Sequence, residues 1–185
     1  MAQFLLAPGM DKIVSRQLSR IASGIAPLNY VLDIGCGPSS RHWKIGISHR
    51  AGFFSQLCPE IFRETGGSSV TTSATGLPFR TNSFDALLCF GLVHHLQDDW
   101  ARQTLQEALR VTRSSGQIIV FDPVLPKRPW LRPIAWSLCK LDRGRFIRSQ
   151  PQYESQILPP GKWRVQRIMH SYLGTEGIFC VLKKP

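Results

Sequence analysis

The sequence has few of the features that mark membrane, secreted or metal-binding proteins. Its longest apolar runs, such as 86–93, are far shorter than the roughly 20 residues that a membrane-spanning helix needs. The first residues contain neither a basic leader nor a cleavage site. The five cysteines are odd in number and never form a C-x-x-C pair, which argues against both a disulfide framework and a zinc site. We therefore expect a cytoplasmic protein with reduced, buried thiols and no metal site.

Acidic residues are scarce in one part of the chain. The 185 residues include 23 Lys and Arg against 12 Asp and Glu, a net charge of +11. Residues 1–126 carry 11 basic and 9 acidic side chains, whereas residues 127–167 carry 10 and 2. Such a concentration of positive charge attracts nucleic acid, an anionic membrane surface or a negatively charged substrate. The charge alone does not distinguish these three partners.

Short apolar segments alternate with helical patterns along a chain whose length suits one domain. The expected strands are 30–34, 52–55, 69–72, 86–91 and 117–122, and the expected helices are 11–25 and 99–113. This alternation predicts a parallel sheet covered by helices. Near the end of the chain, 163–172 and 178–182 predict two strands joined by a turn of hairpin length.

The most informative single motif is the glycine-rich segment that follows the first expected strand, Val31-Leu32-Asp33-Ile34-Gly35-Cys36-Gly37. Glycines at the carboxyl end of a strand let the backbone approach a ligand closely. The segment differs from the dinucleotide fingerprint, which would need a third glycine at Ser40. The carboxylate of Asp33 can organise the turn or act electrostatically near a sulfonium or ammonium group. Taken alone, the motif fits a purely structural strand-to-helix turn equally well.

Further segments follow the glycine motif in the order found in one enzyme family. They are Leu77-Pro78-Phe79, Asn82-Ser83-Phe84-Asp85, Gly91-Leu92-Val93-His94-His95-Leu96 and Arg110-Val111-Thr112-Arg113-Ser114-Ser115-Gly116. With the glycine motif they resemble the class I S-adenosylmethionine (SAM)-dependent methyltransferases, most closely the small-molecule "type 11" branch that includes ubiquinone-biosynthesis enzymes. The resemblance covers about 30–123. It implies one domain over 1–185, with an α/β, Rossmann-like, seven-stranded, mostly parallel sheet, one antiparallel strand and a C-terminal β-hairpin.

The resemblance also implies SAM as cofactor and places its contacts at the ends of strands. The implied contacts are Asp33, Gly35, Cys36, Gly37, Phe54, Ser73, Ala74 and Phe90. Two of them depart from the family, because Phe54 and Ser73 stand where acidic residues usually meet the ribose and the adenine. Phenylalanine accepts no hydrogen bond, and a lost hydrogen bond to a charged group costs about 1.5–3 kcal/mol, so we expect weak binding of SAM. A second alignment makes 44–48 the ribose-binding strand and supplies no carboxylate either.

Two adjacent histidines are the candidate catalytic residues. Methyl transfer needs a base only where a hydroxyl acceptor must lose its proton, since positioning and desolvation contribute much of the rate. His94 and His95 follow the fourth expected strand, and imidazole titrates near neutral pH. The structural alternative is that one packs against a helix and the other forms a hydrogen bond. The spacing of His42, His49 and His170 predicts no metal site, and we expect these on the surface or in loops.

Residues 123–162 form a basic, proline-interrupted insertion that we expect on the substrate side. One face of its expected helix carries Trp130, Ile134, Leu138 and Leu141, with Arg132, Trp136 and Lys140 roughly opposite. Either this apolar face covers the active site while the basic side meets an anionic acceptor, or it packs in the core. Tryptophans among basic residues over 127–148 also suit peripheral contact with a membrane. Asp142-Arg143-Gly144 resembles an element of bacterial members of the "type 11" branch.

These observations predict a SAM-dependent methyltransferase acting on a small molecule that is anionic or lipid-associated. The departures at Phe54 and Ser73 support an alternative, a methyltransferase-like binding or scaffold protein with weak or no activity. An RNA methyltransferase ranks below both. The fourth-strand position holds Phe90-Gly91-Leu92-Val93 instead of an Asn-Pro-Pro-Tyr type of run, and the sequence contains no separate RNA-binding domain.

Overall fold

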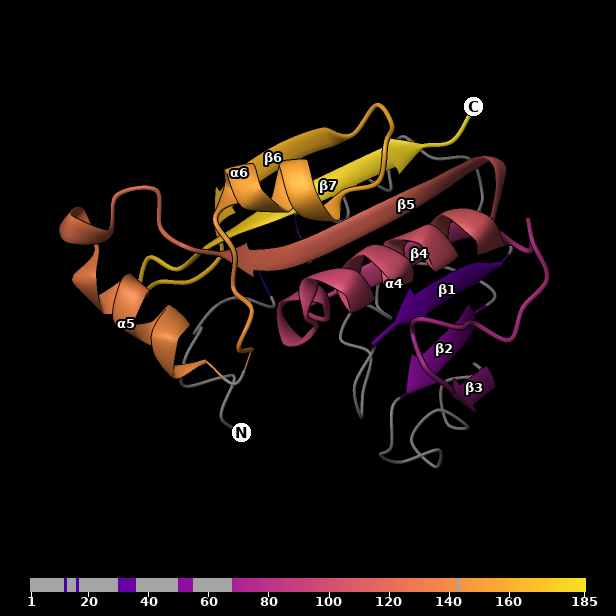
Figure 1. Ribbon diagram of the computed structural model, residues 1–185, viewed down its shortest axis with the longest axis horizontal. Coiled ribbons are helices and arrows are strands. Elements are labelled where there is room, and N and C mark those ends of the chain that lie inside the picture. The colour runs from indigo at the N-terminus through magenta and orange to yellow at the C-terminus, as the bar shows by residue number, and fades with distance from the viewer. Residues whose placement is uncertain (1–11, 13–15, 17–29, 36–49, 55–67, 143) are drawn as a thin grey trace.

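The computed structural model describes residues 12, 16, 30–35, 50–54, 68–142 and 144–185, which contain a sheet of seven strands (Figure 1). The strands are β1 (Val31–Ile34), β2 (Arg50–Phe54), β3 (Ser68–Thr71), β4 (Phe84–Phe90), β5 (Thr112–Val124), β6 (Arg164–Met169) and β7 (Glu176–Lys183). Their order across the sheet is β3-β2-β1-β4-β5-β7-β6. Strands β1 to β5 pair in parallel, and β7 runs antiparallel to both β5 and β6. The predicted mixed α/β, Rossmann-like architecture is confirmed.

Hydrophobic side chains alternate between the two faces of the sheet, because successive residues of a strand point in opposite directions. One face buries Leu32, Ile34, Leu87, Cys89, Ile118 and Val120. The other face buries Val31, Ala86, Leu88, Ile119, Phe121 and Phe179. Strands buried on both faces are typical of parallel sheets, and this explains why β1 and β4 are apolar apart from Asp33 and Asp85.

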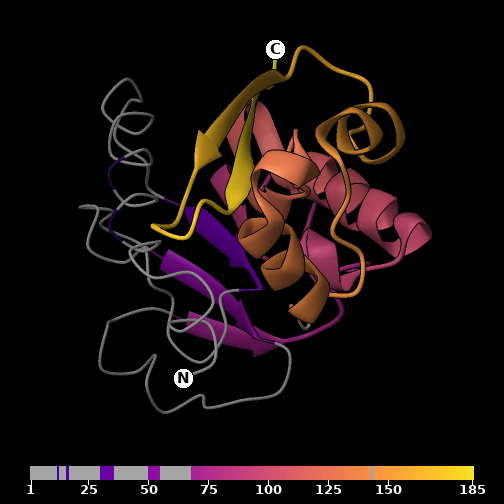
Figure 2. The same ribbon diagram turned by 90° about the vertical axis from the view of Figure 1, so that its left-hand side faces the viewer.

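Helix α4 (Asp98–Val111) covers the first of these faces. Its buried residues Ala101, Leu105 and Ala108 recur at the spacing of an amphipathic helix. Asp98 and Asp99 lie in its first turn, where negative charge interacts favourably with the helix dipole. The short helix α6 (Gln150–Gln152) and the π-helical turn η3 (Tyr153–Ile157) lie on the same side of the sheet as α4 (Figure 2).

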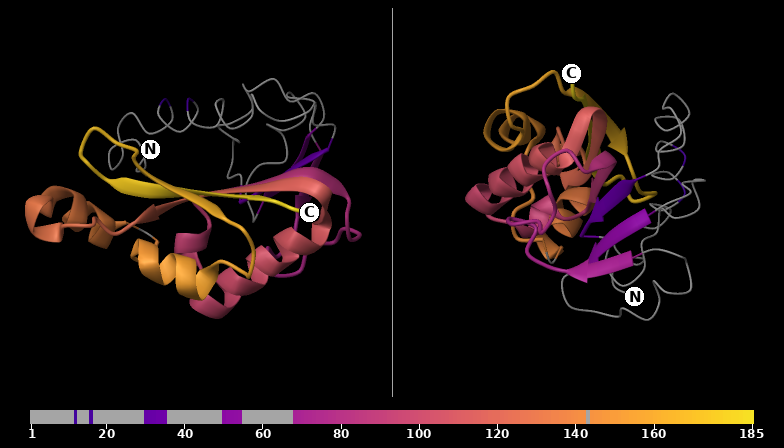
Figure 3. Two further views of the ribbon diagram at one scale, coloured as in Figure 1. Left: turned by 90° about the horizontal axis from the view of Figure 1, so that it is seen from above. Right: turned by 90° about the vertical axis from the view of Figure 1, so that its right-hand side faces the viewer.

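The segment after β5 leaves the sheet before the chain returns to it. It contains a single helical turn, η2 (Pro129–Leu131), and a short helix, α5 (Pro133–Leu141), which project beyond the carboxyl end of β5 (Figures 1 and 3). The predicted helix is present, but Trp130 belongs to η2. The apolar residues Ile134 and Leu141 are exposed, so they do not join the core. None of the helices in the described residues is long and apolar enough to span a membrane.

Two predicted elements lie wholly or largely outside the described residues. The first predicted helix, over 11–25, is described only at Lys12 and Arg16, which are both helical. The second alternative for the ribose-binding strand, 44–48, lies outside the described residues altogether. The other candidate for the ribose-binding strand, 52–55, overlaps the observed β2. Strand β5 is longer than predicted, because it begins directly after α4 at Thr112.

Candidate functional site

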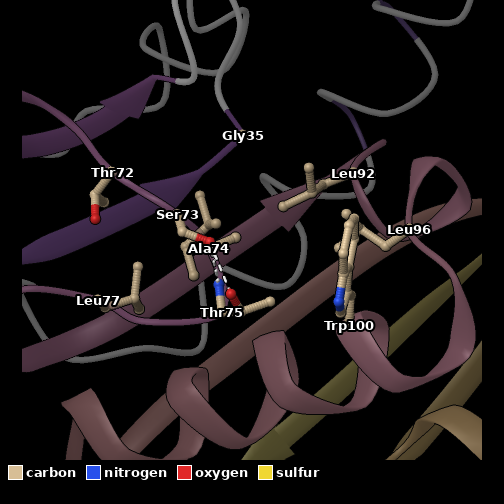
Figure 4. A pocket seen from close by; sticks show the side chains of 10 residues that line it. Gly35, Thr72, Ser73, Ala74, Thr75, Leu77, Leu92, Leu96 and Trp100 are labelled. Carbon is tan, nitrogen blue, oxygen red and sulfur yellow. Dashed lines mark hydrogen bonds between the residues drawn. The ribbon is translucent and has the colours of Figure 1, made fainter.

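A pocket of about 380 Å³ opens at the carboxyl end of β1, beside the turn after β3 and the segment after β4 (Figure 4). Its lining residues are Ile34, Gly35, Thr72, Ser73, Ala74, Thr75, Leu77, Leu92, Leu96 and Trp100. Strand order reverses at β1, since β2 lies on one side of it and β4 on the other. In open α/β sheets, ligands bind at such a switch point, outside the carboxyl ends of the strands.

Gly35 forms the floor of this pocket, and its backbone conformation requires glycine. Its φ is +74°, and a Cβ atom built on it would lie 3.0 Å from the Cβ of Leu92. Asp33, two residues earlier, is buried in β1 with 6% of its surface exposed. Of the predicted cofactor contacts in this motif, Gly35 lines the pocket. Cys36 and Gly37 lie outside the described residues.

A tight turn after β3 supplies the polar side of the pocket. The hydroxyls of Ser73 and Thr75 share one hydrogen bond of 2.7 Å, and the amide of Gly76 donates to the carbonyl of Ser73 at 3.2 Å. Because two hydroxyls use only one hydrogen between them, the second hydrogen is left to donate to a ligand. Ala74, between them, packs against the hydrophobic core. The predicted contacts Ser73 and Ala74 therefore both line the pocket.

Helix α4 anchors the segment that follows this turn. The backbone amide of Leu77 donates to Glu107 Oε2 at 2.8 Å. The guanidinium of Arg110 donates to the carbonyls of Leu77 at 2.9 Å and Phe79 at 2.7 Å, and it also pairs with Glu107. Hydrogen bonds to Arg110 lower the pKa of the Glu107 carboxyl. The Leu77-Pro78-Phe79 segment is therefore held against α4, and Leu77 forms part of the pocket wall.

Leu92, Leu96 and Trp100 form the opposite, apolar wall (Figure 4). The indole of Trp100 is 54% exposed although it stands in the first turn of α4 next to the fully buried Ala101. The spacing of apolar residues in 99–113 groups Trp100 with Ala101, Leu105 and Ala108 and so predicts a buried position for it, whereas it does not point to Leu92 or Leu96. No local sequence pattern identifies this wall, because the periodicity of the helix does not reveal that the indole is exposed.

The two remaining predicted cofactor contacts are phenylalanines that end β2 and β4. Phe54 is the last residue of β2, and its Cα is in register with that of Thr71 in β3. The ring of Phe90 packs on the other face of the sheet, with ring centroids 6.3 Å from Phe121 and 6.2 Å from Phe179. The structure therefore does not bring Phe90 to this pocket.

His94, in the single turn η1 (Val93–His95), is enclosed by two aspartates. Its Nδ1 lies 3.0 Å from Asp122 Oδ1, and its Nε2 lies 3.7 Å from Asp142 Oδ1. Burial lowers the pKa of His94, but the charge and hydrogen bond of Asp122, together with the charge of Asp142, outweigh it and raise the pKa above its usual value. The side chain is only 4% exposed. These contacts favour a protonated imidazole that interacts with both carboxylates. They are consistent with the alternative in which His94 forms a structural hydrogen bond.

The segment 144–148 lies against η1. A Cβ built on Gly144 would lie 1.9 Å from Cδ2 of His94, so only glycine fits against the ring. The amide of Phe146 donates to the carbonyl of His94 at 3.0 Å. The buried Arg148 donates to the carbonyls of Val93 and Leu96, and it also pairs with Asp98 at 2.6 Å. The close approach of Gly144 to the His94 ring explains why the Asp142-Arg143-Gly144 element ends in glycine.

The other histidines have different surroundings. His95 is exposed, and its ring centroid lies 4.0 Å from that of His94. His170 follows β6 in a loop, as expected, yet it is buried, and burial lowers its pKa to about 4. Among the described residues, no cluster of three or more His, Cys, Asp or Glu side chains could hold a metal ion.

Similarities to known families and proteins extend across much of the chain. A family model described as "Methyltransferase domain" matches residues 32–120. The human protein named "Probable tRNA methyltransferase 9B" is 30% identical over 121 residues, which are 62% of this chain and 26% of that protein. The demethylmenaquinone methyltransferase of Mycobacterium sp. (strain KMS) is 32% identical over 125 residues, or 63% of this chain and 50% of that enzyme.

The YcgJ protein of Bacillus subtilis has the same fold. The two structures superpose with a TM-score of 0.67 at 16% sequence identity, and the match covers 92% of this chain and 98% of YcgJ. The curated relatives named as tRNA methyltransferases are much longer, since the human one is matched over only 26% of its length.

Proposed function

We propose that the chain is a class I SAM-dependent methyltransferase, as the family match over residues 32–120 indicates, and that it transfers the methyl group of SAM to a small-molecule acceptor. The observation that carries the proposal is the pocket at the switch point of the sheet, between Gly35, the Ser73–Gly76 turn and Trp100. Its volume of about 380 Å³ lies within the range of small-molecule sites.

The residues around the pocket fit this cofactor in three respects. Gly35 lines the pocket without a side chain, so the ligand can approach the backbone of the turn. The hydroxyls of Ser73 and Thr75 have one hydrogen available for a ring nitrogen. Leu77 and Trp100 offer apolar surfaces on which a flat adenine can pack. SAM would supply a methyl group on a positively charged sulfur, and Asp33 would contribute negative charge two residues before Gly35.

The two adjacent histidines divide their roles in this proposal. His95 is exposed and takes the proton from a hydroxyl acceptor, which is the usual task of a histidine base. His94 is a positioning residue, because Asp122 and Asp142 occupy its nitrogens and Gly144 covers its ring. By fixing η1, it fixes both the orientation of His95 and the position of Leu92 at the pocket.

The acceptor that we propose is small and either anionic or lipid-associated. The basic insertion 123–162 follows β5, whose carboxyl end lies on the pocket side of the sheet. One relative is named a demethylmenaquinone methyltransferase, which is consistent with a lipid-like acceptor. Weak or absent turnover remains the expected alternative if the positions of Phe54 and Ser73, which lack carboxylates, reduce SAM affinity too far.

A second candidate acceptor is tRNA. It is favoured by the relatives named as tRNA methyltransferases and by the 10 basic residues against 2 acidic ones in 127–167. We rank it second because large exposed apolar side chains share the basic surface.

Calorimetric titration with SAM and with S-adenosylhomocysteine tests the proposal. We expect saturable binding that Trp100→Ala weakens and that a distant exposed change, Lys162→Gln, leaves unaltered. Transfer of a labelled methyl group is then compared between a lipid extract and total tRNA. Silence at millimolar ligand would remove the cofactor site, whereas binding without transfer to either pool would favour the scaffold alternative. Label in tRNA alone would promote the second candidate.

A further inference from the structure

The projecting pair η2 and α5 exposes large apolar side chains that soluble surfaces normally keep scattered. The exposed fractions are 75% for Trp130, 62% for Leu131, 64% for Ile134 and 73% for Leu141. Ile134 and Leu141 are seven residues apart, so they lie on the same side of α5 two turns from each other. Ala135 and Cys139, which are buried, define the inward side of the same helix. The exposed side of α5 therefore presents Ile134 and Leu141 beside the polar Ser137 and Lys140.

Exposed basic side chains lie in and beside η2 and α5 in the sequence. Lys127, Arg128, Lys140 and Arg145 are all exposed. Arg132 and Arg148 differ from them, because Arg132 pairs with Glu176 at 3.0 Å and Arg148 is buried against Asp98. Lys127, Arg128, Lys140 and Arg145 thus keep their positive charge exposed, while Arg132 holds the projection to β7 and Arg148 holds the following segment to the start of α4.

We propose that η2 and α5 form a docking surface for an anionic lipid bilayer. The docking surface consists of Lys127, Arg128, Lys140 and Arg145 together with Trp130, Leu131, Ile134 and Leu141. Amphipathic helices with Trp and Leu on one side and Lys or Arg beside them bind in the plane of the bilayer interface. Each basic residue near an anionic surface strengthens this binding roughly fivefold.

The aliphatic residues favour a bilayer over a nucleic acid. Phosphate groups would satisfy the basic residues, and a base could stack on Trp130, but the phosphate backbone offers no apolar partner for Ile134 or Leu141. Acyl chains offer that partner, and headgroup phosphates accept hydrogen bonds from the basic residues at the same time. Only a partner that is both apolar and anionic can interact with the apolar residues and the basic residues of the docking surface at the same time.

The position of the docking surface in the fold has a consequence for the pocket. Strand β5 leads at Val124 towards η2, and the pocket lies at the carboxyl ends of β1 and β4, which run parallel to β5 (Figure 1). Seen from the end that carries α5, the carboxyl ends of these strands point towards the viewer (Figure 2). Docking therefore turns the pocket side of the sheet towards the bilayer, where a lipid-associated acceptor would be found.

Vesicle sedimentation of the full chain tests the proposal without cofactor or acceptor. Phosphatidylcholine vesicles with and without phosphatidylglycerol are compared at low and at high salt. We expect a clear preference for the anionic vesicles that Lys127→Gln/Arg128→Gln reduces about 25-fold. The matched control Lys162→Gln/Arg164→Gln removes the same charge from exposed positions at the far end of β6, and we expect it to bind like wild type.

A second variant, Trp130→Ser/Ile134→Ser/Leu141→Ser, keeps the charge and removes the apolar part. We expect it to lose binding that survives high salt while its thermal unfolding stays unchanged, because all three side chains are exposed. An absence of preference for anionic vesicles overturns the proposal, and so does an equal loss in the matched control. Retention by tRNA but not by vesicles would assign the surface to RNA. Failure in any of these ways leaves SAM binding, measured separately, untouched.

Discussion

Gly144 is expected to be the most sensitive glycine of the described residues outside the pocket. In Gly144→Ala, the new methyl group would lie 1.9 Å from Cδ2 of His94 and 2.9 Å from its Cγ and Nε2. The ring cannot move aside freely, because Nδ1 is bonded to Asp122, which is itself only 1% exposed. Either this hydrogen bond breaks or the segment 142–148 is displaced from η1. Overpacking and a lost charged hydrogen bond together cost about 2–4 kcal/mol.

Thermal unfolding followed by circular dichroism measures this cost. For a chain of this size, the expected loss corresponds to a fall in Tm of roughly 5–15 °C. Gly76→Ala is the matched control, since a Cβ there meets no atom within 4 Å. In a His94→Ala background the ring is gone, so we expect Gly144→Ala to cost less than about 1 kcal/mol. Equal Tm values for Gly144→Ala and Gly76→Ala would refute the steric explanation. An undiminished destabilisation by Gly144→Ala in the His94→Ala background would refute it too.

Three further predictions concern the pocket and its histidines. Gly35→Ala should weaken SAM binding at least about tenfold in calorimetry, because alanine is strained at positive φ and contacts Leu92; restoration by Leu92→Ala alone would contradict the backbone part of this reason. His95→Gln should lower kcat on a hydroxyl acceptor about 10²–10⁴-fold with an unchanged KM for SAM, and remove the acidic limb of the pH–rate profile; an unaltered profile would exclude His95 as the base. The pKa of His170 falls to about 4 on folding, so the unfolded chain binds a proton there more readily. The contribution of His170 to the free energy of unfolding is therefore complete above about pH 6.5. It is lost towards pH 4 at up to about 1.4 kcal/mol per pH unit. His170→Gln should flatten this part of the curve in urea titrations, and a curve as steep as that of wild type would count against it.

Local patterns in the sequence are sufficient to predict much of the fold. The apolar runs of β1 and β4 predict buried parallel strands, and the periodicity of α4 predicts its buried side. The polar start of β5 at Thr112 has no such pattern, so the predicted strand is too short. In the site, the glycine motif and Ser73 can be placed because each directly follows a strand.

The remainder depends on contacts between distant segments. His94 meets Asp122 across 28 residues, and the segment around Gly144 comes from farther along the chain, so no local spacing reports their contact. Periodicity reveals that α5 has an apolar side, but it cannot reveal that this side faces solvent. The same limit applies to Trp100, whose helix has a clear buried side that the indole avoids.

Helix α4 contributes to both sides of the pocket. Near its start it presents Trp100, and farther along Glu107 and Arg110 hold the backbone of Leu77 and Phe79 on the opposite side. The width of the pocket therefore depends on how α4 packs on the sheet. A change beneath α4, far from any ligand, would tilt both walls together and alter cofactor affinity without touching a binding residue.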